Sequence, residues 1–190
     1  MVVKRGRIYD IVITALMTAV MCVASFITIP VGAVPVTLQT FVVYIACAVL
    51  GTKKAVISVL LYLLLGVLGL PVFSSFRGGP GVLAGATGGY ILGFLLIALL
   101  SGEIIRIKKH NRIVMFVAFL TGTLLCYLAG TLWYVLIYIG ELNFHNFAGA
   151  FSVCVVPFIV PDIIKMFVAS IVAKSLCERG VINENNRQRA

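Results

Sequence analysis

Charged residues are scarce in this sequence. Only 11% of the 190 residues are Asp, Glu, Lys or Arg, whereas 62% are hydrophobic. A typical soluble domain carries about 25% charged residues and about 45–50% apolar ones. Because even a well-packed small domain leaves roughly a third of its chain surface in water, a soluble fold of this size could not hide so many apolar side chains. The composition therefore excludes an ordinary soluble protein and favours one that lies in a lipid bilayer.

The sequence also lacks room for a soluble domain. A membrane-spanning helix needs about 20 mostly apolar residues, so six such helices with short loops would occupy the whole chain. No GxxxxGK[ST] phosphate-binding loop occurs in the sequence. We therefore predict a single domain, residues 1–190, and we expect any ATP hydrolysis to come from a partner.

Patterns typical of metal sites and disulfides are missing as well. The five cysteines lie far apart, and nearly all of them fall within apolar stretches. The sequence has no C-x-x-C motif and no Cys/His cluster, which are the usual signs of a metal site or a disulfide framework. We expect the cysteines to be small packing residues, and we expect no metal and no other cofactor.

Long apolar segments occupy most of the chain and are separated by Pro, Gly or basic residues. The segments are 9–29, 36–51, 54–70, 88–107, 112–139 and 150–176. They predict an all-α integral membrane protein, a bundle of six transmembrane helices. The second and third segments are short, so they are expected to be tilted or partly re-entrant at the Pro35 end. The first is longer than the apolar core of a signal peptide, and we expect it to remain in the mature protein.

The basic residues alternate between the loops. All of the fifteen Lys and Arg residues except Arg77 and Lys165 lie before the first segment, between the second and third, between the fourth and fifth, or at and after the end of the sixth. Cytoplasmic loops carry the basic excess of membrane proteins, so this pattern predicts that both termini are cytoplasmic and that the number of spans is even. The net charge of +9 is thereby explained by membrane topology, and we expect no nucleic-acid partner.

Two oppositely charged residues lie inside the last apolar segment. Asp162 and Lys165 are three residues apart, so they share one face of a helix and can neutralise each other. Charged residues within membrane helices usually face the bundle interior. Pro161 leaves the carbonyl of Pro157 without its helical partner, and broken helices at membrane depth commonly line cavities. The pair either only pins the helix or also binds a polar ligand, and we favour the second reading.

A glycine-rich stretch runs from Ser74 to Tyr90 and holds six glycines. We predict an irregular outer loop here. The loop is either a flexible connector or a lid whose backbone N–H groups approach a ligand closely, with Arg77 as a bidentate donor to a carboxylate. Thr87 is the expected N-cap of the helix that follows.

Thr37 and Gln39 are polar side chains that enter the membrane at the outer end of the second segment. Each needs a hydrogen-bond partner in that environment. The partner is either a neighbouring helix or a substrate, and the sequence does not favour one over the other.

Ala15 and Ala19 form a groove of small residues, four apart, on the first segment. Such a groove lets another helix approach closely. Packing inside the same bundle and docking to another protein both remain open.

Several stretches, in order along most of the chain, resemble the BioY family. They are Ile29-Pro30, Pro35–Gln39, Gly69–Phe73, Gly85–Tyr90 and Pro157–Lys165. The resemblance implies a six-helix substrate-binding (S) subunit of an energy-coupling-factor (ECF) vitamin transporter, with a biotin pocket that faces outwards. It implies a multi-pass subunit of a prokaryotic plasma-membrane importer rather than an enzyme. Its partners would be a transmembrane coupling subunit (EcfT-like) and two cytoplasmic ATPase subunits (EcfA-like).

The resemblance also assigns roles to residues. Asp162 and Lys165 match charged residues of the biotin site, and the Ala15–Ala19 groove matches the contact with the coupling subunit. The biotin ureido ring suits Asp162 as an acceptor, and the biotin carboxylate suits Lys165 or Arg77, a choice that stays open. The expected substrate-binding residues are Thr37, Gln39, Phe73, Arg77, Thr87, Gly88, Gly89, Tyr90, Asp162 and Lys165.

Other functions fit the sequence less well. An S subunit for a different vitamin would share every feature above except the biotin-specific residues. An intramembrane enzyme could use Asp162 as an acid or base, but the sequence offers no paired nucleophile and no second central carboxylate. A passive channel would need a continuous polar path through the membrane, and the few polar groups in the apolar segments do not supply one.

Overall fold

A computed structural model describes residues 7–30, 34–107 and 111–178, and within these ranges the chain is almost entirely helical. The helices are α1 (Arg7–Phe26), α2 (Gln39–Leu50), α3 (Thr52–Val67), α4 (Pro80–Leu83), α5 (Gly88–Ile107), α6 (Arg112–Tyr134), α7 (Phe144–Cys154) and α8 (Val156–Glu178). A π-helical turn, Val135–Ile139, continues α6. The basic residues Lys4, Arg5, Lys108, Lys109, Arg179, Arg187 and Arg189, which enter the topology prediction, lie outside the described residues.

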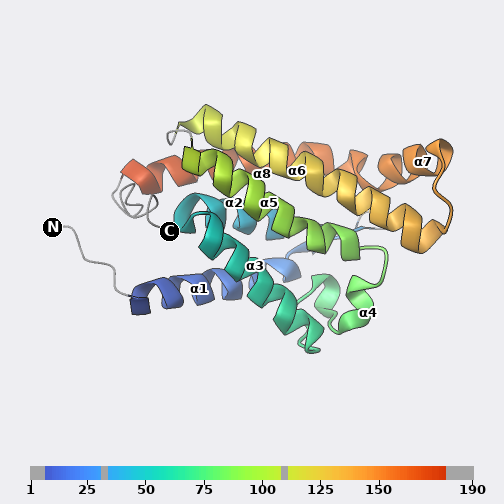
Figure 1. Ribbon diagram of the computed structural model, residues 1–190, viewed down its shortest axis with the longest axis horizontal. Coiled ribbons are helices and arrows are strands. Elements are labelled where there is room, and N and C mark those ends of the chain that lie inside the picture. The colour runs from blue at the N-terminus through green and yellow to red at the C-terminus, as the bar shows by residue number, and fades with distance from the viewer. Residues whose placement is uncertain (1–6, 31–33, 108–110, 179–190) are drawn as a thin grey trace.

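The helices pack around α2. Val43, Tyr44 and Ala46 on this helix are completely buried, and α2 contacts α1, α3, α5 and α8. The start of α1 and the last turns of α8 lie at one end of the bundle, and α4 and α7 lie at the other (Figure 1). A central helix buried on several sides places its first residues deep inside the protein, where they can contribute to an internal site.

Helices α5 and α6 lie side by side along most of their length, because glycines let their backbones approach closely (Figure 1). A Cβ atom at Gly93 would lie 2.5 Å from the Sγ of Cys126, and one at Gly122 would lie 2.6 Å from the Oγ of Ser101. Both distances are shorter than any real contact of a Cβ atom. Small residues at these positions therefore set the spacing of the two helices, as is common between membrane helices.

Among the described residues, four helices are long and apolar enough to cross a membrane. They are α1, α5, α6 with its π-helical continuation, and α8. At 12 and 16 residues, α2 and α3 are shorter than the roughly 20 residues of a typical span. Many large apolar side chains of the long helices face outwards. The mostly helical, lipid-compatible fold is thus confirmed.

The first two predicted segments have different boundaries where they meet. The first helix ends at Phe26, and the second begins at Gln39 rather than at residue 36. Between them the chain forms an antiparallel pair of short strands, β1 (Thr28–Ile29) and β2 (Val36–Thr37), in which Thr28 faces Thr37. Threonine, isoleucine and valine are β-branched and favour strands.

The predicted last segment, 150–176, is divided in the structure. α7 begins at Phe144, because the side chain of Asn143 caps it by accepting a hydrogen bond from the Asn146 N–H at 2.7 Å. The helix then breaks at Val155, and α8 follows with Pro157 in its first turn and Pro161 in its interior.

The glycine-rich stretch is more ordered than predicted, since Ser74–Phe76 forms a 3-10 turn and Pro80 begins the short α4.

Candidate functional site

A cavity lies between the first halves of α2, α5 and α8 and the second half of α6, next to the segment that contains β2. The space between its lining atoms is partly enclosed and partly open to solvent. The lining residues are Val34, Pro35, Thr37, Gln39, Thr40, Ser74, Thr87, Tyr90, Ile91, Phe94, Cys126, Tyr127, Phe158, Asp162 and Lys165.

The predicted ion pair forms one wall of this cavity. The Nζ of Lys165 donates to the Oδ1 of Asp162 at 2.7 Å, and the two residues are only 8% and 2% exposed. Thr40, at the start of α2, joins the pair because its hydroxyl accepts from Lys165 at 3.2 Å and donates to Asp162 at 3.3 Å. From α6, the hydroxyl of Tyr127 donates to the Oδ2 of Asp162 at 2.5 Å. Three helices therefore hold this charged group in place.

The ion pair keeps hydrogen-bonding capacity for a ligand. An ionised carboxylate has about four lone-pair positions, and a lysine ammonium has three N–H donors. Among the described residues, Asp162 accepts from three donors, and Lys165 donates to two acceptors. One acceptor position of Asp162 and one N–H of Lys165 thus remain without a partner among these residues, and both side chains line the cavity. This arrangement suits a ligand group that presents an N–H and a carbonyl side by side.

Gln39 and Thr37 have protein partners and also line the cavity. The Nε2 of Gln39 donates to the hydroxyl of Tyr62 at 2.5 Å, and the hydroxyl of Thr37 donates to the Oε1 of Gln39 at 3.2 Å. Tyr62 on α3 is thus a neighbouring-helix partner of Gln39, and contact of Gln39 or Thr37 with a substrate stays a prediction. Fixed in this way, the two polar groups form a second polar edge of the cavity.

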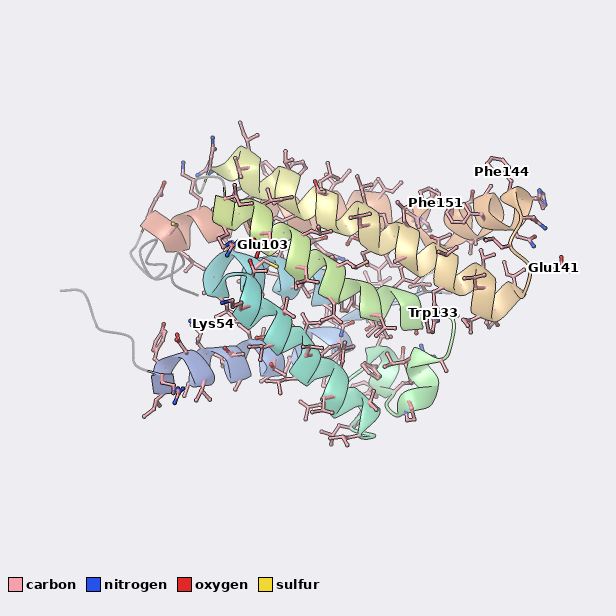
Figure 2. The ribbon with its side chains drawn as sticks, viewed as in Figure 1. Lys54, Glu103, Trp133, Glu141, Phe144 and Phe151 are labelled. Atoms are coloured by element: carbon pink, nitrogen blue, oxygen red, sulfur yellow. The ribbon has the colours of Figure 1, made fainter. Side chains whose placement is uncertain are left out.

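Tyr90 and Thr87 belong to the start of α5 and the residue before it, and both are buried at the cavity. The hydroxyl of Tyr90 lies 3.0 Å from the Oγ1 of Thr131 on α6. The indole N–H of Trp133 donates to the carbonyl of Gly85 at 3.2 Å and so ties α6 to the loop that leads to Thr87. Figure 2 shows Trp133 beside the start of α5. These contacts fix the aromatic side of the cavity.

Phe73 and Arg77 are two of the four predicted binding residues that lie outside the cavity lining. Phe73 is fully buried in the core, edge-on to the ring of Tyr62 and packed against Gly66. Arg77 is exposed, and its Nε donates to the carbonyl of Ser74 at 3.4 Å. Ser74, which directly follows Phe73 in the sequence, does line the cavity. Arg77 is therefore not part of the cavity wall that Asp162 and Lys165 form.

Gly88 and Gly89 serve helix packing in this structure and are not part of the cavity lining. A Cβ atom at Gly88 would lie 1.7 Å from the carbonyl oxygen of Leu83, and one at Gly89 would lie 2.2 Å from the Cβ of Trp133. Any side chain at these positions would push α5 away from α4 or α6. Close packing against Leu83 and Trp133 therefore explains why glycine is required at positions 88 and 89, and no ligand contact is needed to explain it.

Ala15 and Ala19 are both exposed on the outer face of α1. The opposite face of α1 is bound to α3, where Thr18 donates to the carbonyl of Ser58 at 3.1 Å and Ser58 donates to the carbonyl of Thr14 at 3.1 Å. Packing within the described bundle thus does not occupy the alanine groove.

Thr40 and Tyr127 are site residues that the sequence analysis missed. Their hydrogen bonds to Asp162 join positions 122 and 35 residues apart. Thr40 follows Gln39 directly, so the polar start of α2 is a signal that could have found it. Tyr127 lies within a long apolar segment, where no local pattern separates it from an ordinary packing residue.

Comparisons with known proteins identify the family of this chain. The sequence profile of the BioY family matches residues 2–180. The chain is 39% identical over 159 residues to the biotin transporter BioY of Thermotoga maritima, an alignment that covers 84% of this chain and 90% of that protein. It is 40% identical over 167 residues to the probable biotin transporter BioY of Pyrococcus horikoshii, covering 88% of this chain and 95% of that protein.

A solved structure has the same fold. It is the crystal structure, at 2.1 Å, of the S-component for biotin from an ECF-type ABC transporter, and it matches with a TM-score of 0.81. The match covers 94% of this chain and 95% of that chain at 24% sequence identity. Because the family profile extends over nearly the whole sequence, this chain belongs to the BioY family.

Proposed function

We propose that this protein is the biotin-binding S subunit of an ECF-type importer, a transporter subunit and not an enzyme. It captures biotin from the outside and releases it inwards when it is coupled to a transmembrane coupling protein and two ATPase subunits. The family, the biotin transporters among its relatives and the shared S-component fold support this function. The observation that carries the proposal is the buried Asp162–Lys165 pair with unused hydrogen-bonding capacity at a cavity wall.

The chemistry of biotin fits the two sides of the cavity. The ureido group presents N–H donors next to a carbonyl, which matches the free acceptor of Asp162 and the free donor of Lys165. The thioether ring and the methylenes match the apolar side formed by Tyr90, Phe94 and Phe158. Of the two cations suggested for the biotin carboxylate, Lys165 lines the cavity and Arg77 does not.

In the membrane, we expect six spans within a single domain of residues 1–190, with both termini in the cytoplasm of a prokaryotic cell. The four long helices would span together with α2 and α3, which are too short to cross the whole hydrocarbon layer as helix alone. The ion pair between Asp10 and Lys54, at 2.8 Å, joins the starts of α1 and α3. The last turns of α8 lie at the same end of the bundle (Figure 1), as the charge pattern of the sequence predicts.

Biotin binding can be followed directly through the single tryptophan of the protein. Trp133 is bonded to the loop that leads into the cavity, so occupancy of the cavity should change its fluorescence. Titration of the purified protein with biotin should give a saturable change, confirmed with radiolabelled biotin, whereas riboflavin and thiamine should give none. Tight binding of riboflavin or thiamine, without binding of biotin, would show that the protein is an S subunit for another vitamin.

Assembly with the coupling subunit is expected to depend on the alanine groove of α1. Ala15→Trp or Ala19→Trp would fill this exposed groove and block the close approach of a partner helix. We expect at least about a ten-fold loss of co-purification with the coupling subunit, which corresponds to roughly 1.4 kcal/mol, with biotin affinity unchanged. Leu124→Trp, on the half-exposed outer face of α6, is the matched control. Equal loss in the control would show a non-specific effect.

A further inference from the structure

A second cavity lies at the end of α5 remote from the ion pair. It is a small hollow, partly open to solvent, formed by the turn between α2 and α3 and by the last turns of α5. Figure 2 shows Glu103 and Lys54 at this end of the bundle. No contact of the proposed biotin site reaches this cavity among the described residues.

Thr52, in the wall of this cavity, has a buried hydroxyl without a partner. The residue is 8% exposed, and its Oγ1 is the buried side-chain oxygen or nitrogen that lacks a hydrogen bond among the described residues. The Oγ1 of Thr52 lies beside Gly102, because a Cβ atom built at Gly102 would be 2.8 Å from this oxygen. Buried polar groups are almost always paired, so an unpaired hydroxyl at a cavity wall points to a missing partner.

The surroundings of Thr52 favour an anion as that partner. α3 is 16 residues long and begins at Thr52, and its N-cap, Gly51, supplies no side-chain hydrogen bond to the first amides. These amides carry the positive end of the helix dipole, which is a common binding site for phosphate. Lys53 and Arg106 add two positive charges at the cavity, whereas Glu103, paired with Arg106 at 2.8 Å, removes one.

We infer that this cavity binds the phosphate of an anionic membrane phospholipid. The helices that form the cavity also expose apolar side chains, among them Ile57 on α3 and Leu99 on α5. Acyl chains can lie along such surfaces while the headgroup occupies the end of the bundle. Basic pockets between membrane helices are known to select acidic headgroups. The site is separate from biotin recognition and depends only on the protein lying in a membrane.

Lipid-dependent stabilisation of the full-length protein in detergent tests this inference. Phosphatidylglycerol should raise the thermal unfolding midpoint in a saturable way, and phosphatidylcholine, which has no net charge, should raise it much less. Inorganic phosphate at millimolar concentration should give no comparable shift. If inorganic phosphate alone reproduces the full shift, the ligand is a soluble anion and the assignment to lipid is wrong.

Variants locate the site. Arg106→Gln and Lys53→Gln should each weaken phosphatidylglycerol binding by about five-fold, because each removes one charge near the headgroup. Lys174→Gln, which alters another basic residue near the end of α8, is the control and should bind as the parent does. Equal weakening in all three variants would show a general charge effect and would overturn the site.

Thr52→Val separates a ligand contact from a structural role. Without lipid its unfolding midpoint should equal or exceed that of the parent, because valine replaces a hydroxyl that has no partner in the chain. With phosphatidylglycerol its stabilisation should be smaller than that of the parent. A midpoint lowered equally with and without the lipid would overturn the inference. Biotin binding, measured in parallel, should be unchanged, so failure here is distinct from failure of the proposed function.

Discussion

Asp162→Asn is expected to weaken biotin binding by at least about 30-fold. Removing one charge of a buried, hydrogen-bonded pair typically costs about 2–5 kcal/mol of binding, and 1.4 kcal/mol is a factor of ten in affinity. The asparagine keeps the shape of the side chain but loses the charge that balances Lys165 and orients the hydroxyls of Thr40 and Tyr127. Radiolabelled biotin binding to the purified variant, or calorimetry, measures the change.

The control for this experiment is Arg77→Gln. Arg77 is the other cation that the sequence suggested for biotin, but its side chain is exposed and outside the cavity lining. We expect its replacement to change the affinity by less than about five-fold, as is usual for an exposed charge. Parent-like affinity in Asp162→Asn together with a large loss in Arg77→Gln would show that biotin binds elsewhere.

The double variant Asp162→Asn/Lys165→Met separates the structural role of the ion pair from its role in binding. Lys165→Met alone leaves the buried Asp162 carboxylate without its counter-charge, which should cost about 3–5 kcal/mol of stability. Replacing both residues removes both buried charges, so most of this stability should return. Biotin binding should not return, because the adjacent donor and acceptor are gone. Thermal unfolding in detergent and a binding assay on the same samples give the two results.

A second ion pair gives the matched control for the double variant. Asp10 and Lys54 also lie 2.8 Å apart, but their side chains are 39% and 27% exposed. Breaking this pair with Lys54→Met should cost only about 0–1 kcal/mol and leave biotin affinity unchanged. If Asp162→Asn/Lys165→Met bound biotin as the parent does, the buried pair would only pin α8, and our account of recognition would fail.

The sequence predicted those parts of the fold and site that depend on local spacing. α5 has the predicted bounds, 88–107, because an apolar run begins after a glycine-rich loop and ends at basic residues. The contact between Asp162 and Lys165 was predicted because residues three apart on a helix share a face. Local periodicity was sufficient in both cases.

Other features depend on contacts between distant segments and were therefore not predictable. The strands β1 and β2 pair with each other, but both lie within apolar segments whose composition predicts helix. Phe73 and Ser74 are neighbours, and no local pattern indicates that the serine faces the cavity while the phenylalanine packs on Tyr62. Tyr127 reaches Asp162 only because α6 packs against α8.

The short central helix α2 has a consequence for biogenesis. Its 12 residues extend about 18 Å, well below the roughly 30 Å thickness of the hydrocarbon layer. Alone, it would make a poor signal for lateral release from the translocation machinery. Since only Gly51 separates it from α3, the two are expected to enter the bilayer together as a helical hairpin. The innermost part of the protein would then depend on the emergence of α3 from the ribosome before it could be stably inserted.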